Sequence, residues 1–87
     1  MQNNFYTLNY NQIMKMRIIK NIIKDNKNDL SDYELLTLHD LLYFISKDKK
    51  AITANKKLIH LFKKENMPMQ PCEVDRDIYV LHEGTSL

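Results

Sequence analysis

Glycine and cysteine each occur once in this chain of 87 residues, and tryptophan does not occur at all. A single glycine, Gly84, excludes the glycine-rich loops that hold phosphate groups in nucleotide-binding enzymes. A single cysteine, Cys72, excludes an internal disulfide and suits a reducing compartment. Only two arginines, Arg17 and Arg76, are present, so few side chains are suited to reading base edges in the DNA major groove.

Long hydrophobic runs are also missing. The run at residues 41–45 is far shorter than the roughly 20 apolar residues that span a bilayer. The first four residues have neither the basic start nor the apolar core of a signal peptide. We therefore expect a cytoplasmic protein without a membrane partner.

The remaining composition is typical of one small globular domain. Hydrophobic residues make up 44% of the chain and charged residues 28%, which is too apolar for a disordered segment. A chain of this length lies near the lower limit of what folds without metals or disulfides. Lysine, asparagine and isoleucine are frequent, and their A/T-rich codons indicate a bacterial AT-rich genome or a mobile element.

The charges are segregated along the chain, although the net charge is only +2. Residues 14–24 and 46–64 are mainly basic, whereas residues 25–40 and 72–87 are mainly acidic. Such blocks indicate charge complementarity within the molecule or between molecules, rather than one uniformly basic surface.

A capping box marks the start of a central helix. Ser31 can accept a hydrogen bond from the backbone N–H of Glu34, and the Glu34 side chain can reach back to Ser31. We expect this helix to cover residues 32–46. Methionine and isoleucine four residues apart predict an earlier amphipathic helix over residues 11–24.

A third helix is predicted over residues 49–65, where Asn66 can supply a left-handed cap and Pro68 prevents continuation. Its polar side is rich in lysine, which allows two interpretations: a solvated helix face, or a surface that contacts nucleic-acid phosphates. The lysines of the second interpretation are Lys49, Lys56, Lys57, Lys63 and Lys64.

The two ends of the chain have the pattern of short strands. Residues 67–71 form a linker with two prolines, and residues 77–82 read as a strand. Residues 5–8 are similar, so the two segments could pair as a small ribbon, or either could add to a partner's sheet. The expected fold class is mainly α, a compact three-helix domain of residues 1–87.

Apolar residues exceed what three short helices bury easily. Leu36, Tyr43 and Phe44 spread around the second helix, away from its inner stripe. They either fill a small core or form a protein–protein interface, for which a homodimer is one form.

The stretch from Asn21 to Leu35, about fifteen residues, resembles the end of one helix, the turn and the capping box of the Hha/YmoA family. Members of that family are small all-helical bacterial proteins that dock on the nucleoid protein H-NS and tune silencing of AT-rich acquired genes. The resemblance implies modulation of gene expression and contacts to a protein partner through Asp29, Asp32 and Glu34.

Catalytic and metal-ligating patterns are not found. His39, Asp40, His60, Cys72 and His82 show neither the i, i+4 spacing nor the Cys-x-x-Cys spacing of zinc sites. The acidic residues before and within the second helix are explained by capping and by the helix dipole. We expect no enzyme activity, no metal and no cofactor.

Together these patterns predict a small non-enzymatic regulator that acts by binding another protein, whose identity stays open. One alternative is a nucleic-acid-binding protein that uses the lysines of the third helix. A second alternative is an inhibitor or immunity protein that blocks a nuclease or toxin.

Overall fold

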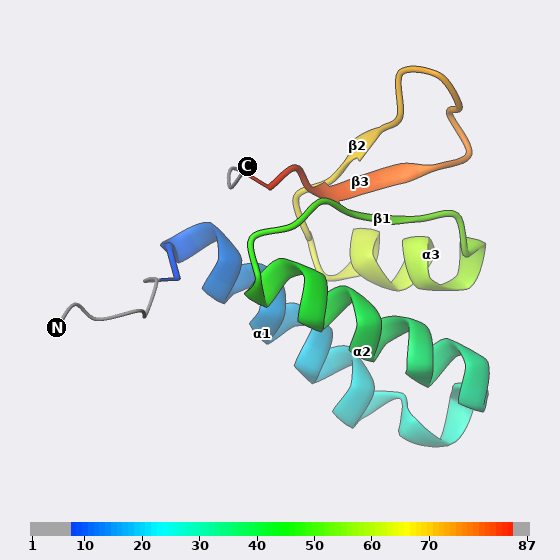
Figure 1. Cartoon of the computed structure of the whole chain (residues 1–87). Helices are drawn as coiled ribbons and strands as arrows, with labels where there is room; N and C mark the ends of the chain where they lie inside the picture. The colour runs from blue at the N-terminus through cyan, green and yellow to red at the C-terminus, as the bar shows by residue number, and fades with distance from the viewer. Residues whose placement is uncertain (1–7, 85–87) are drawn as a thin grey trace, which may run out of the picture.

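Three α-helices and a three-stranded antiparallel sheet form the part of the chain, residues 8–84, that the computed structural model describes. Figure 1 shows α1 and α2 as an antiparallel pair, with α3 and the sheet packed together on one side of it. The prediction of three helices in a compact, largely helical protein is confirmed. The elements in chain order are α1 (Tyr10–Asp25), the 3₁₀ turn η1 (Lys27–Asp29), α2 (Asp32–Ser46), β1 (Ala51–Thr53), α3 (Lys56–Lys64), β2 (Gln70–Pro71) and β3 (Tyr79–His82).

Both long helices begin with a capping box. In α2 the backbone N–H of Glu34 donates to Ser31 Oγ at 3.1 Å, and the N–H of Ser31 donates to Glu34 Oε1 at 2.9 Å. In α1 the same pair of hydrogen bonds joins Asn9 and Gln12. Each box satisfies two backbone donors that have no partner inside the helix, so both helices start at defined residues.

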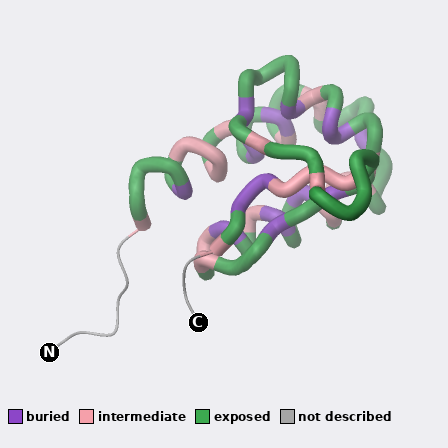
Figure 2. Tube along the Cα trace, turned by 90° about the horizontal axis from the view of Figure 1, so that it is seen from above, coloured by how far each residue is buried: buried purple, intermediate pink, exposed green. Residues whose placement is uncertain are grey.

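The core lies between the helix pair, α3 and the sheet, and Figure 2 shows buried segments on every element that faces this interior. Phe62 of α3 is the largest of the fully buried side chains. The other buried core side chains come from all parts of the fold: Ile19, Ile22, Leu30, Leu38, Leu41, Ile45, Ala51, Leu58, Met67 and Leu81. Side chains from all three α-helices, β1 and β3 thus share one core, which fixes the position of α2 against its neighbours.

The third helix is shorter than predicted. The expectation of a helix over residues 49–65 was wrong for its first seven residues, which are not helical. Residues 51–53 form β1 instead, and α3 starts at Lys56. Asn55 accepts a hydrogen bond from the backbone N–H of Leu58 at 3.0 Å and so caps α3. At the other end, the predicted left-handed cap is confirmed, since Asn66 has φ 59°.

The sheet has the strand order β1-β3-β2, with both pairings antiparallel. β3 lies within the predicted strand at residues 77–82, so that expectation is confirmed. Residues 67–71 are more than a linker, because they contain β2. The expected partner strand at residues 5–8 lies outside the described residues, apart from Leu8, which precedes α1 without regular structure.

The turn between α2 and β1 is held by the end of β3. Asp48 has a left-handed backbone, φ 55°, which ends α2 and redirects the chain. His82 Nε2 lies 2.7 Å from Asp48 Oδ1, and both side chains are largely buried. This contact joins residues 34 positions apart, so the path that the chain takes after α2 depends on the C-terminal strand.

Candidate functional site

A line of exposed residues runs along the outer side of α2. Its members recur at intervals of three and four residues, which brings them to one side of the helix. Three of its aromatic and aliphatic side chains are more than half exposed: Tyr33 at 72%, Leu36 at 61% and Tyr43 at 53%. We define the α2 face as Tyr33, Leu36, Asp40, Tyr43 and Phe44.

Leu36, Tyr43 and Phe44 were the apolar residues proposed from the sequence for an interface, and all three are exposed on α2. Tyr33, which lies one turn before Leu36, belongs to the same line. Its spacing from Leu36 was the signal that could have identified it. The apolar surplus of the second helix is therefore partly on the surface, rather than entirely in the core.

The C-terminal half of the α2 face contains an aromatic pair. The rings of Tyr43 and Phe44 have centroids 6.1 Å apart and an interplanar angle of 61°, an edge-to-face arrangement. Lys47 Nζ lies 5.7 Å from the centroid of the Tyr43 ring. These contacts within the helix favour one arrangement of the rings, so this half of the face is partly preorganised.

The N-terminal half of the α2 face borders a shallow hollow beside β1. Tyr33 and Thr37 line it from α2, and Ile52, itself exposed, lines it from β1. The Thr37 hydroxyl donates to the carbonyl of Tyr33 at 2.9 Å, so its hydrogen bond is made within α2, and the exposed Tyr33 and Ile52 supply the apolar lining. Apolar surface thus continues from α2 onto an edge strand of the sheet.

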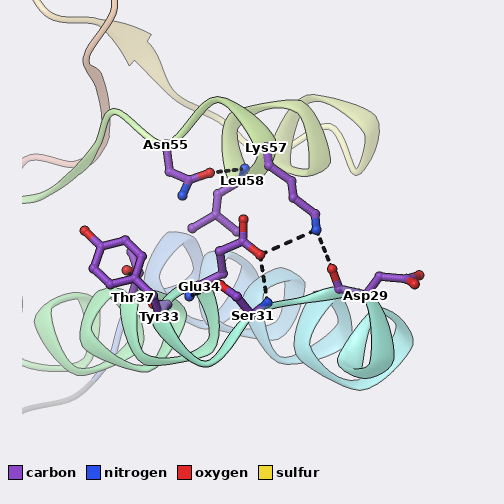
Figure 3. Close-up of polar contacts among 8 residues, drawn as sticks. All are labelled: Asp29, Ser31, Tyr33, Glu34, Thr37, Asn55, Lys57 and Leu58. Carbon is purple, nitrogen blue, oxygen red and sulfur yellow. Dashed lines mark hydrogen bonds and ion pairs between the residues drawn. The ribbon is translucent and has the colours of Figure 1, made fainter.

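Two of the three acidic residues expected at a partner contact interact with α3 (Figure 3). Lys57 Nζ lies 3.4 Å from Glu34 Oε1 and also donates a hydrogen bond to the backbone carbonyl of Asp29. Asp29 thus contributes its main chain to this contact, while Glu34 contributes its carboxylate. Asp32, in the first turn of α2, is exposed to solvent. As contacts to a partner, these residues stay a prediction.

The pKa of Glu34 lies below the usual carboxyl value because the ionised form receives hydrogen bonds. The largest cause is the backbone N–H of Ser31, and the charge of Lys57 lowers the pKa further. Partial desolvation acts in the opposite direction but is weaker. The first turn of α2 is therefore anchored by an ionised carboxylate.

The five lysines of the nucleic-acid interpretation do not share one face. Lys49 lies in the turn before β1, so its expected position on the third helix was wrong. Lys57 points toward α2, whereas Lys63 Nζ lies 4.9 Å from the centroid of the Tyr79 ring and donates to its hydroxyl at 3.2 Å. Lys56 and Lys64 are exposed at opposite ends of α3.

The fold builds a different basic groove that the sequence alone did not reveal. Lys56, His60 and Lys63 line one wall from α3, and Arg76 and Tyr79 line the other from the C-terminal segment. One acidic residue, Asp77, also lines this groove. No local spacing connects residues 56–63 with residues 76–79, because their proximity depends on pairing of β3 with β1.

The histidines and the cysteine that the sequence offered as metal ligands lie at separate places in the fold. His39 Nδ1 lies 2.8 Å from the carbonyl of Leu35, His82 is paired with Asp48, and Cys72 is partly buried beside β2. Across residues 8–84 no three His, Cys, Asp or Glu side chains gather as a metal site. Within the same range, no helix is long and apolar enough to cross a membrane.

The chain matches no protein-family model, and neither a curated protein nor a solved structure is significantly similar to it. Its function is therefore inferred from two surfaces: the apolar α2 face and the basic groove beside Tyr79.

Proposed function

We propose that this chain is a small non-enzymatic regulator that binds another protein through the α2 face. The exposure of Tyr33, Leu36 and Tyr43 along one side of a well-anchored helix carries this proposal. Covering apolar surface contributes about 25 cal/mol per Å² removed from water. Tyrosine and phenylalanine are also enriched at protein interfaces relative to the rest of the surface.

The rigidity of α2 supports the same function. Its start is held by Ser31 and by the contact of Glu34 with Lys57, and its end by a hydrogen bond from Gln12 to the carbonyl of Ile45. A preformed helix loses little conformational freedom when a partner binds, which favours affinity. The α2 face is thus suited to recognition by shape and apolar contact.

The setting that we propose is the cytoplasm of a bacterium or a bacterial mobile element. The composition and the resemblance of residues 21–35 to the Hha/YmoA family support a role in modulating gene expression through a protein partner. In such a role the exposed carboxylate of Asp32 would lie beside the apolar contact, at the first turn of α2.

Affinity capture with the tagged chain from host lysate, with and without nuclease, tests this function. We expect a stoichiometric protein partner that survives nuclease and is lost with Leu36→Asp. Val74→Asp is the matched control, because Val74 is 95% exposed and lies outside the α2 face. Capture that is unchanged by Leu36→Asp, or abolished equally by both variants, would contradict the proposal.

A second candidate function is nucleic-acid binding in the basic groove. The observation that favours it is the position of Arg76 and Tyr79 opposite Lys56, His60 and Lys63. Positive groups beside an aromatic ring are the combination with which proteins bind single-stranded nucleic acids. The Lys63 ammonium beside the Tyr79 ring would then neutralise a phosphate close to a stacking surface.

Titration of a labelled single-stranded oligonucleotide at several salt concentrations tests this second function. We expect Arg76→Gln to weaken binding. It should also reduce the slope of log affinity against log salt concentration by about 0.7, the value for one phosphate contact. Lys27→Gln, an exposed lysine in η1, is the control of equal charge change. Equal effects of both variants, or no binding at low salt, would exclude the groove.

A further inference from the structure

A second exposed stripe runs along α1 with the same spacing as the α2 face. All of its members are exposed, whereas Ile19 and Ile22 on the opposite side are buried. Intervals of three and four residues are those of helices that pack side by side at a shallow angle. We define the α1 stripe as Tyr10, Ile13, Arg17, Lys20 and Lys24.

The α1 stripe includes a hollow that can receive a side chain. Leu8, Ile13 and Met16 give this hollow an apolar wall, and Arg17 and Lys20 line its polar side. A large apolar side chain of a partner helix, such as a tyrosine or phenylalanine, fits a site with this lining. The α2 face exposes both residue types in Tyr43 and Phe44.

The charges of the two surfaces are complementary. The α1 stripe has three basic residues and no acid, while the charged residue of the α2 face is Asp40. Arg17 and Asp40 occupy the middle positions of their helices. Within residues 8–84 neither takes part in an ion pair, so each is available to an external group of opposite charge.

We propose that a second copy of this chain covers the α2 face, with the α1 stripe of one copy packed antiparallel against the α2 face of the other. In this arrangement Arg17 of one copy meets Asp40 of its partner. The inference rests on the proposed function in one respect: both use the α2 face, so another protein binds there by displacing the second copy.

The antiparallel direction is favoured by the charges at the ends of the stripes. With Arg17 opposite Asp40, Lys24 reaches Tyr33 and Asp32 of the other copy, and its ammonium can lie against that ring. A parallel arrangement would bring Lys24 beside Lys47, and like charges at an interface are unfavourable. The antiparallel direction also brings Ile13 and its hollow opposite the Tyr43–Phe44 pair.

A two-fold dimer makes this contact twice. Each copy has both surfaces on the antiparallel pair of α1 and α2 that Figure 1 shows. When α1 of the first copy packs on α2 of the second, the symmetry axis brings α1 of the second onto α2 of the first. Four helices then form a closed assembly with two pairs of Arg17 and Asp40.

Sedimentation equilibrium over a wide concentration range tests the inference. We expect the chain to form dimers, and Arg17→Asp and Asp40→Arg each to weaken dimerisation about tenfold or more, because each variant places like charges opposite each other. An equimolar mixture of the two variants should recover the wild-type association, since every contact is then again between opposite charges. Lys27→Asp, an exposed site outside both surfaces, should leave association unchanged.

A monomer at every concentration, an open series of larger species, or a mixture that associates no better than either variant would overturn the inference. Far-UV circular dichroism of each variant verifies that the helices are retained. The proposed function is tested separately from the dimer. If the protein is monomeric and Leu36→Asp abolishes partner capture, the proposed function is supported and the dimer is contradicted. If the protein is a dimer that captures no other protein, the dimer is supported and the proposed function is contradicted.

Discussion

The side-chain amide of Gln12 joins the start of α1 to the end of α2. Its Nε2 donates to the carbonyl of Ile45 at 2.8 Å, and its Oε1 accepts from the backbone N–H of Asn9 at 3.0 Å. Gln12 is only 2% exposed, so both bonds lie where an unpaired polar group would be costly. One side chain therefore caps the first helix and aligns the second against it.

Replacement of Gln12 by alanine should lower the free energy of unfolding by about 2 kcal/mol. The variant removes a helix cap and leaves the Ile45 carbonyl without its donor from α1. Urea denaturation followed by circular dichroism measures the change. Asn11→Ala, at an exposed position of the same helix outside the α1 stripe, should stay within about 0.5 kcal/mol of wild type. Equal stability of the two variants would show that the link from Gln12 to Ile45 does not stabilise the fold.

Gly84 follows β3 and lies against the turn between α2 and β1, and two features of its position require glycine. Its φ is 80°, and a Cβ atom would lie 2.8 Å from the carbonyl oxygen of Asp48 and 2.9 Å from the backbone nitrogen of Lys50. Gly84→Ala should therefore destabilise the protein by about 2 kcal/mol, measured by the urea midpoint. Glu73→Ala, in an exposed loop, serves as the control. An unchanged midpoint for Gly84→Ala would mean that the segment after β3 does not pack on the turn between α2 and β1.

The buried contact between His82 and Asp48 should be measurable as a coupling energy. We expect His82→Ala to cost about 2 kcal/mol, because it leaves the Asp48 carboxylate without this partner. Asp48→Asn should cost less, since asparagine retains an acceptor oxygen and tolerates the left-handed backbone. A double-mutant cycle by urea denaturation isolates the pair. Fully additive effects would show that the two side chains act independently.

Acid should weaken the first turn of α2 through Glu34. Because its pKa is lower in the folded protein than in the unfolded chain, its contribution to stability is complete above the ordinary carboxyl pKa of about 4.3 and is lost as the pH falls through the folded value. Carboxyl chemical shifts followed by NMR should report the low pKa directly. Lys57→Gln should raise it part of the way toward normal, leaving the effect of the Ser31 hydrogen bond.

Glu34→Gln is the comparison for stability. It retains an oxygen that can accept from Ser31 but removes the charge, so the gap in unfolding free energy between wild type and variant should narrow as the pH falls below about 4. A gap that stays constant between neutral and acidic pH would contradict the role of the ionised carboxylate.

Local sequence patterns were sufficient for α1 and α2. Ser31 and Glu34 are neighbours along the chain, so the start of α2 depends on contacts within one turn. The exposure of Leu36 and Tyr43 follows similarly, because the buried stripe of the same helix leaves them on the other side. Leu36, Tyr43 and Phe44 could therefore be named as interface candidates from the sequence, which left burial in a small core as the alternative.

The start of α3 could not be predicted in this way. Residues 51–53 carry no strong local signal against a helix, and they form β1 because β3, nearly thirty residues later, supplies the hydrogen-bonding partner. The left-handed Asp48 and its contact with His82 depend on the same distant strand. Strand pairing is non-local, so the periodicity within one segment of the sequence does not predict it.

The sequence by itself determined the two long helices, the short C-terminal strand and the apolar outer side of α2, because capping, periodicity and side-chain polarity act over a few residues. Only the tertiary structure decided that Lys57 holds Glu34 and that Arg76 and Tyr79 lie beside Lys63. Those neighbours are brought together by burial of Phe62 and Leu81 in a common core. Distance along the chain says nothing about such contacts, whereas packing of the whole molecule fixes them.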